Sequence, residues 1–95
     1  MSDQFLIDLA PGWALGFDQK QWIIYRVYFK RDTARLLPVS FIASTRAVLR
    51  RCIQECEIEL TPEAVEYIDA MPDTFRAWYR WHKRRGALVP EQEAA

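Results

Sequence analysis

The stretch Trp22-Ile23-Ile24-Tyr25-Arg26-Val27-Tyr28-Phe29-Lys30 decides the fold, because most of its residues are of types that favour β-strands. Side chains alternate between the two faces of a strand, so the stretch divides into two sets. The first set is apolar and predicts a face turned toward the core: Ile23, Tyr25, Val27 and Phe29. The second set mixes rings with cations and predicts a face turned toward water or a ligand: Trp22, Ile24, Arg26, Tyr28 and Lys30.

Two more strands are expected beside this one. Residues 13–17 form a short strand, and residues 35–42 form a return strand after a turn at residues 31–34. Pro38 cannot donate a hydrogen bond to a ladder, so the return strand should lie at a sheet edge or carry a bulge there. The apolar residues Phe5, Leu6, Ile7 and Leu9 belong to either an extra edge strand or an arm laid across the core.

Three helices follow the predicted sheet. Ser44 or Thr45 caps the first, whose apolar residues recur at helical spacing. Thr61-Pro62-Glu63 predicts the start of the second, with a cap residue, a proline in the first turn and an acid near the positive helix end. The third helix is expected from Phe75 to about residue 85, ending at Gly86.

These elements predict an α+β fold: a three-stranded antiparallel sheet packed with three helices in a single compact domain. Residues 1–12 are expected to be the N-terminal arm or edge strand, residues 13–86 the domain, and residues 87–95 a frayed tail. The expected core is Ile23, Tyr25, Val27, Phe29, Phe41, Val48, Leu49, Cys52, Ile53, Val65, Ile68, Phe75 and Trp78.

Composition narrows the class of protein. A hydrophobic content of 51% in 95 residues argues against disorder, and 14% aromatic residues places some rings at the surface, as in a binding face. Cys52 and Cys56 lie four residues apart, which is typical of reduced thiols rather than of a disulfide scaffold. The sequence has neither an apolar run of membrane-spanning length nor a signal peptide, so we expect a cytoplasmic protein that does not bind membranes.

Charge is sorted along the chain in blocks. Residues 19–51 hold eight bases and one acid (+7), residues 52–73 hold seven acids and no base (−7), and residues 74–86 hold five bases (+5). The net charge of zero therefore hides strong local fields, which govern steering and binding more than the total does. Basic blocks with interleaved rings favour an anionic ligand.

Two basic surfaces are candidates for binding nucleic acid. On the third helix, Arg76, Arg80, Lys83 and Arg84 form one line beside Trp81, which suits phosphates and a stacked base. The same cations could instead pair with the acidic helix before them or complement the helix dipole. On the sheet, the candidates are the cations and ring of the central strand and its turn, unless the third helix covers them: Arg26, Tyr28, Lys30, Arg31 and Arg35.

The order of strands and capped helix resembles a known family. Trp22-Ile23-Ile24-Tyr25-Arg26, Val39-Ser40-Phe41 and Ser44-Thr45-Arg46 together resemble the AP2-like arm-type DNA-binding domains of phage integrases, over residues 13–57. The resemblance implies a sheet lying in the major groove and a helix bracing its back. It also implies that Arg26, Tyr28, Lys30 and Arg35 contact DNA. Pro38 and the two C-terminal helices depart from that family's pattern.

The acidic block supports a rival interpretation. Glu59, Glu63 and Glu66 follow one helical line, with Asp69 beyond them, and such a line can mimic a phosphate backbone. The chain also resembles the small proteins of phages and prophages, which include anti-CRISPR and other anti-defence inhibitors that bind a host protein. The acidic block could equally balance the basic blocks within the fold.

The residues that could support catalysis or bind a metal form no recognised pattern. Cys52, Cys56 and His82 are poorly spaced for a zinc site and lack the partners of an activated nucleophile. We therefore expect a non-catalytic binding protein without metal or cofactor. Its partner is expected to be DNA or, alternatively, a host protein, and a dimer is compatible with either.

Overall fold

The chain folds into a four-stranded sheet followed by three helices. The structure, a computed structural model, describes the backbone of residues 4–94 and the side chains of residues 4–84. Its elements are β1 (Gln4–Ala10), β2 (Trp13–Phe17), β3 (Trp22–Lys30), β4 (Thr33–Ile42), α1 (Arg46–Glu55), α2 (Pro62–Ala70) and α3 (Phe75–Ala94). The strands are antiparallel, in the order β1-β2-β3-β4. The α+β class is confirmed, but three strands was wrong, because residues 4–10 pair with β2 as a fourth.

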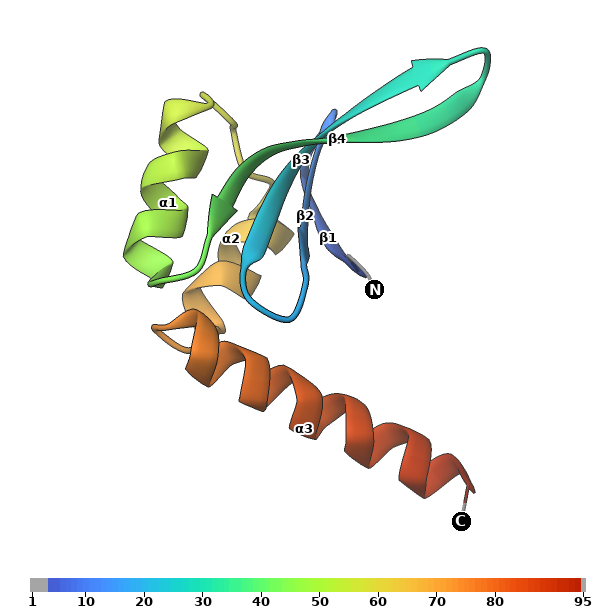
Figure 1. The fold of residues 1–95 in the computed structure, drawn as a ribbon, viewed down its shortest axis with the longest axis vertical. Coiled ribbons are helices and arrows are strands. Elements are labelled where there is room, and N and C mark those ends of the chain that lie inside the picture. Colours follow the sequence, from blue (N-terminus) through green and yellow to red (C-terminus); the bar gives the residue numbers. More distant parts are fainter. Residues whose placement is uncertain (1–3, 95) are drawn as a thin grey trace.

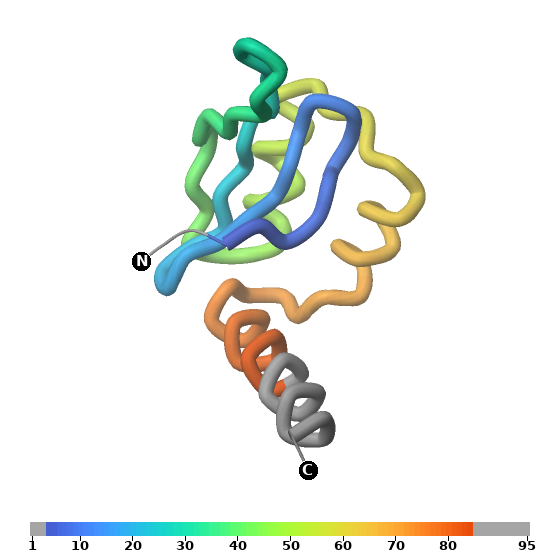
Figure 2. The backbone as a smooth tube through the Cα atoms, turned by 90° about the vertical axis from the view of Figure 1, so that its right-hand side faces the viewer, coloured from blue at the N-terminus to red at the C-terminus, as the bar shows by residue number. Residues whose placement is uncertain are grey.

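The helices pack against one face and one end of the sheet. Figure 1 shows α1 and α2 beside the lower half of the sheet and α3 crossing beneath it, and Figure 2 shows the same layers from the side. Burying apolar side chains between the sheet and the helices is the main source of stability in such a fold. The principal core contains Leu9, Leu15, Phe17, Trp22, Ile24, Ile42, Leu49, Ile53, Ile68, Met71, Phe75 and Trp78.

Threonines cap all three helices. The Thr45 and Thr61 side chains accept hydrogen bonds from Val48 N and Ala64 N, so the predicted starts of α1 and α2 are confirmed. Thr74 accepts from Ala77 N in the same way at the start of α3. The beginnings of α1 and α3 are also joined through the backbone, since Thr45 and Thr74 form an isolated β-bridge.

The predicted inward face of β3 was wrong. Trp22 and Ile24 face the helices and are fully buried, whereas Ile23 and Tyr25 lie on the opposite side in a small separate cluster with Ala14. The cations that made the second set look solvent-facing all lie in the outer half of the strand. In the inner half, that set supplies a fully buried tryptophan: Trp22 contacts Phe75 and Trp78 at centroid distances of 5.3 and 5.8 Å.

Three residues expected in the core are exposed. Phe29 is 73% exposed, Phe41 57% and Val65 40%, while Val27, Val48 and Cys52 are half-buried. Phe29 and Phe41 lie on the sheet face opposite the helices. Burial is confirmed for the rest of the expected core: Ile23, Tyr25, Leu49, Ile53, Ile68, Phe75 and Trp78.

Pro38 lies in β4, the strand at one edge of the sheet, as its missing donor requires. The ladder with β3 is also irregular beside it, because Ile24 pairs with Ser40 while Tyr25 pairs with Pro38. Both alternatives predicted for this strand, an edge position and a bulge, are therefore confirmed.

Gly16 allows β1 and β2 to approach closely. A Cβ atom added there would lie 2.6 Å from Gln4 O and 2.7 Å from Tyr25 Cε2, closer than real Cβ contacts come. The two strands also slip register twice, between Phe5 and Ile7 and between Asp8 and Ala10. β1 therefore bends closely over Gly16 of β2, a position that has no side chain.

The predicted end of α3 at Gly86 was wrong. The helix continues to Ala94, so the tail expected at residues 87–95 is helical in its described part, and residue 95 lies outside that part. A single glycine costs a helix interior only about 1 kcal/mol relative to alanine, which is too little to end a long helix by itself.

Candidate nucleic-acid interface

The outer half of the β3–β4 hairpin leaves the body of the molecule. We call residues 26–39 the hairpin arm; in Figure 1 it extends alone toward the upper right, away from the helices. Apart from the half-buried Val27, every residue of the arm is exposed. At the base of the arm, Val27 N donates to Gly12 O at 2.8 Å. Beyond Val27, among residues 4–84, the β3–β4 ladder alone holds the two strands, so from there outward the arm is a free two-stranded ribbon.

The arm ends in a tight turn of two residues. Lys30 pairs with Thr33 as the last rung, and Arg31 and Asp32 between them have φ values of 54° and 66°. Two successive positive φ values match the I′ turn, whose twist suits an antiparallel hairpin. The turn thereby places the Arg31 cation at the far end of the ribbon.

The ladder gathers the arm's other cations on one face. Residues paired across an antiparallel ladder share a face, and the pairs are Arg26 with Leu37, Tyr28 with Arg35, and Lys30 with Thr33. We call the face formed by Arg26, Tyr28, Lys30 and Arg35 the cationic arm face. On the body of the sheet the same face is covered by the helices. The cationic arm face lies farther out along β3 and β4, where α3 does not cover it.

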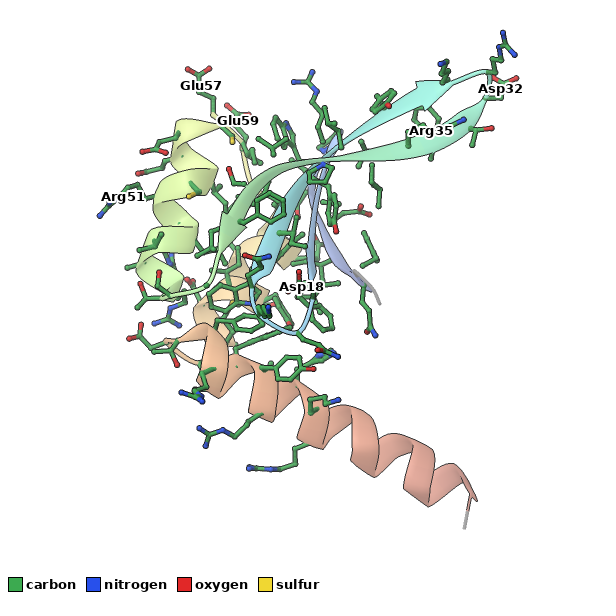
Figure 3. The ribbon with its side chains drawn as sticks, in the orientation of Figure 1. Asp18, Asp32, Arg35, Arg51, Glu57 and Glu59 are labelled. Carbon is green, nitrogen blue, oxygen red and sulfur yellow. The ribbon has the colours of Figure 1, made fainter. Side chains whose placement is uncertain are left out.

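Carboxylates do not neutralise the cationic arm face. Within residues 4–84, ion pairs join Arg46 to Asp73 and Arg50 to Asp69, and both of these arginines lie on α1. Figure 3 shows Arg35 on the arm, far from Glu57 and Glu59 near the end of α1. At the base of the arm, the Arg26 guanidinium lies 5.3 Å from the centroid of the Trp13 ring, a contact that leaves its charge in place.

The basic line of α3 is exposed, but its ring is not. Arg76, Arg80, Lys83 and Arg84 all face solvent, as expected. Trp81 is half-buried and packs near Tyr67 of α2, at a centroid distance of 6.3 Å. Tyr67 of α2 thus lies beside part of the Trp81 ring, and stacking of a base on Trp81 stays a prediction.

The two predicted basic surfaces do not meet. In both Figure 1 and Figure 2 the arm and α3 lie at opposite ends of the molecule, with the body of the sheet between them. The ten predicted nucleic-acid residues thus fall into two separate groups. Five are on the arm side and five on α3.

The acidic residues predicted to follow one helical line do not all lie on it. Glu59 precedes α2 and lies in the loop after α1, so it does not continue the line of Glu63 and Glu66. Asp69 is paired with Arg50, as internal charge balance predicts. Glu63 and Glu66 remain exposed on α2.

The candidates for metal or nucleophile chemistry are dispersed. His82 stacks on Trp78 at a centroid distance of 4.9 Å, and burial raises the pKa of the Cys52 thiol, with Glu55 and Cys56 adding to the rise. Among the described residues, no three His, Cys, Asp or Glu side chains are grouped so that they could hold a metal ion. None of the described helices is long and apolar enough to cross a membrane.

A shallow hollow of about 590 Å³ lies between α1 and α2. Its walls combine the α1 cations Arg50 and Arg51 with apolar side chains from both helices and the loop between them. No acid, histidine, cysteine or hydroxyl side chain lines it: the lining residues are Ala47, Arg50, Arg51, Ile53, Gln54, Ile58, Leu60 and Val65. The hollow therefore lacks the side chains that usually serve in acid–base or nucleophilic catalysis.

Sequence reasoning missed the apolar residues of the arm. Leu36, Leu37 and Val39 are 48%, 52% and 42% exposed, and none was a candidate for binding. A signal was present, because the cations Lys30, Arg31 and Arg35 flank the turn on both strands. Charges on both sides of a hairpin turn indicate that its tip lies outside the core.

Comparisons with known proteins add no relative. No protein-family model matches the chain, and neither a curated protein nor a solved structure resembles it significantly.

Proposed function

We propose that the protein binds double-stranded DNA by inserting the hairpin arm into the major groove with the cationic arm face toward the bases and phosphates. The observation that carries the proposal is a free two-stranded ribbon whose cations have no carboxylate partner among residues 4–84. The major groove of B-DNA, about 12 Å wide, admits a two-stranded ribbon. Arginine and lysine can pair there with guanine or, in any sequence, with phosphates.

The geometry gives each arm cation a distinct position. Arg31 lies at the tip, Lys30 and Arg35 along the ribbon, and Arg26 at its base against Trp13. With the cationic arm face toward the floor of the groove, Lys30 and Arg35 would lie over the bases, and Arg31 and Arg26 at the two ends of the ribbon would meet phosphates at the groove edges. Arg76, Arg80, Lys83 and Arg84 on α3 would meet the backbone at a second place or contribute only a steering field.

The resemblance to AP2-like arm-type domains supports the same ligand but a different geometry. In that family a sheet lies in the groove and a helix braces its back. Here α1 and α2 cover the face that continues into the cationic arm face, so the body of the sheet is not free to lie in a groove. The proposal therefore carries over the residues Arg26, Tyr28, Lys30 and Arg35, and assigns the contact to the ribbon beyond the body.

The alternative, an inhibitor that binds a host protein through acidic residues, has less support. Asp69 is already paired with Arg50, and Glu59 lies off the helix that holds Glu63 and Glu66. A phosphate mimic needs a row of free carboxylates with regular spacing. Two exposed acids on α2 do not make such a row.

The test is the salt dependence of duplex binding, measured by fluorescence anisotropy on a labelled duplex of about 20 bp between about 50 and 200 mM salt. The logarithm of the binding constant should fall linearly with the logarithm of salt concentration, with a slope of about −0.9 for each phosphate neutralised. Lys30→Ala or Arg35→Ala should each reduce the magnitude of the slope by about 1. Both side chains are exposed, so the variants should fold normally.

Arg51→Ala is the matched control, because Arg51 is an exposed cation on α1, outside the proposed interface. It should leave the slope unchanged, whereas Arg76→Ala with Arg80→Ala reports whether α3 makes a second contact. No duplex binding at the lowest salt concentration would exclude the proposal. Arm variants that bind as the wild type does would exclude the arm as the interface.

A further inference from the structure

The sheet has a second, uncharged surface on the side opposite the helices. Phe5 pairs with Gly16, Gly16 with Ile23, and Ile23 with Phe41, so the two phenylalanines flank one row across all four strands. The same face continues into the arm through the pairs of Val27 with Leu36 and of Phe29 with Ala34. We call this surface, made of six residues, the apolar sheet face: Phe5, Val27, Phe29, Leu36, Pro38 and Phe41.

This face is exposed although its residues are apolar. Phe5 and Phe41 are each 57% exposed, Phe29 73% and Leu36 48%. The largest apolar patch on a monomer, typically about 300–600 Å², often marks a place where another surface docks. The arm is therefore two-sided, with cations on one face and apolar side chains on the other.

We propose that a second copy of the chain covers the apolar sheet face, forming a symmetric dimer with the two sheets packed face to face. The charge pattern favours a copy over a foreign protein. Apart from Asp8, which pairs with Ala14 at the margin, the register places no charged residue of β1 to β4 on this face. A twofold axis would therefore bring almost no like charges together.

The size of the face reaches the lower limit for a specific dimer. A phenylalanine offers about 200 Å² of surface, so the exposed parts of Phe5, Phe29 and Phe41 alone supply about 370 Å² per copy, or about 750 Å² in a dimer. The rest of the face, with Val27, Leu36 and Pro38, brings the dimer total to about 1,000 Å², the lower limit for a specific interface.

Both edges of the sheet disfavour the other way of pairing copies, through a continuous strand ladder. Pro38 removes a donor in the middle of β4, and the β3–β4 ladder is irregular beside it. On the other edge, β1 has two register shifts. Such features hinder edge-to-edge pairing, so a second copy meets the face rather than an edge.

The inference does not depend on DNA binding, because it uses the opposite face of the arm. If both hold, the dimer carries two arms whose cations point away from the interface. Each arm then contacts its own stretch of groove, and the DNA site is expected to be twofold symmetric.

The experiment is the molar mass of the full chain, measured by light scattering and sedimentation over a range of concentrations. We expect twice the chain mass of 11.2 kDa. Phe41→Arg together with Phe29→Glu should convert the dimer to a monomer with an unchanged circular-dichroism spectrum. Val65→Arg is the matched control, since Val65 is an exposed apolar residue on α2, away from the sheet, and it should leave the dimer intact.

Three results would overturn the inference. The first is a wild-type monomer at every concentration, and the second is a dimer that survives the double substitution. The third is a monomer in a stoichiometric complex with a different protein that Phe41→Arg releases, because the face would then serve a foreign partner. Loss of duplex binding with the dimer retained would contradict only the proposed function.

Discussion

The inner and outer halves of the β3–β4 hairpin are built from the same residue types but end in opposite environments. In the inner half, Trp22 and Ile24 are fully buried against the helices, and Ile23 and Tyr25 are buried on the other face. In the outer half, Phe29 is the most exposed of the large apolar residues described. The comparison teaches that alternation tells which residues share a face, while burial depends on what the rest of the chain lays over that face.

The largest contrast is expected for one substitution made in each region. Phe17 in the body is 5% exposed, and its ring makes edge-on contacts with the rings of Trp78 and His82 at centroid distances of 5.0 and 4.9 Å. Phe17→Ala should lower the free energy of unfolding by about 3–5 kcal/mol. Phe29→Ala in the arm should cost about 0.5 kcal/mol or less at protein dilutions where the chain is monomeric, because the proposed dimer would otherwise bury this ring. Urea denaturation of both variants measures the difference. Equal losses would mean that the arm is packed in solution.

The second-largest contrast in stability is expected between an arginine of the body, Arg46, and an arginine of the arm, Arg35. Arg46 Nη1 donates to the carbonyl oxygens of Ile68, Asp69 and Met71, at 3.4, 3.0 and 2.8 Å, and so joins α1 to the end of α2. Arg46→Ala should therefore lower the free energy of unfolding by about 1.5–3 kcal/mol, because hydrogen bonds from a charged donor are lost and the carbonyl oxygens are left without that donor. Arg35→Ala should leave stability unchanged within about 0.5 kcal/mol and alter only duplex binding.

Thermal denaturation of these two arginine variants, with duplex titration alongside, separates the roles. If Arg46→Ala unfolded no more easily than Arg35→Ala, the guanidinium would not join the helices. If Arg35→Ala lowered the melting temperature, the arm would not be independent of the body.

The smallest effect is expected for an aspartate in each of two turns, Asp18 in the β2–β3 turn and Asp32 in the β3–β4 turn. In the β2–β3 turn, the Asp18 carboxylate accepts from Lys20 N, Gln21 N and Gln21 Nε2 at 2.7, 3.0 and 3.1 Å. Burial by itself would raise the pKa of Asp18, but these donors hold it below its ordinary value of 3.8. A lowered pKa stabilises the fold above pH 3.8, and that stabilisation is lost as the pH falls through the folded-state value.

Asp18→Asn should therefore reduce stability near neutral pH by about 1 kcal/mol or less, and the difference from wild type should shrink in acid. Chemical denaturation at about pH 6 and about pH 3 measures this. Asp32→Asn at the arm tip is the control, since Asp32 is exposed and lies outside the body. A difference that grows in acid would contradict the assigned sign.

Local chemistry made much of the fold predictable. The caps at Thr45 and Thr61, the proline start of α2 and the interruption at Pro38 each act on a few neighbouring atoms, and the structure has them where the sequence puts them. The buried line of α3 follows from helical spacing in the same way, with Phe75 and Trp78 buried and the four cations exposed. Such features need no knowledge of distant parts of the chain.

The errors arose where distant segments decide the outcome. β1 exists as a strand only because Gln4–Ala10 pairs with β2. The inward face of β3 depends on the side of the sheet against which α1, α2 and α3 pack. The arm is exposed because no element in the described part of the chain covers β3 and β4 beyond Arg26. The cations of the candidate site could be found from charge, but their division between two ends of the molecule follows only from the three-dimensional arrangement.

Gly16 imposes an evolutionary constraint that reaches beyond its own position. Alanine there would strike the Gln4 carbonyl on one neighbour and the Tyr25 ring on another, so the substitution would require both to shift together. Descendants of this chain that lose the glycine should therefore also lose the N-terminal strand or the tyrosine. Across divergent sequences, a residue other than glycine at position 16 should occur together with a smaller side chain at position 25 and a shifted or missing first strand.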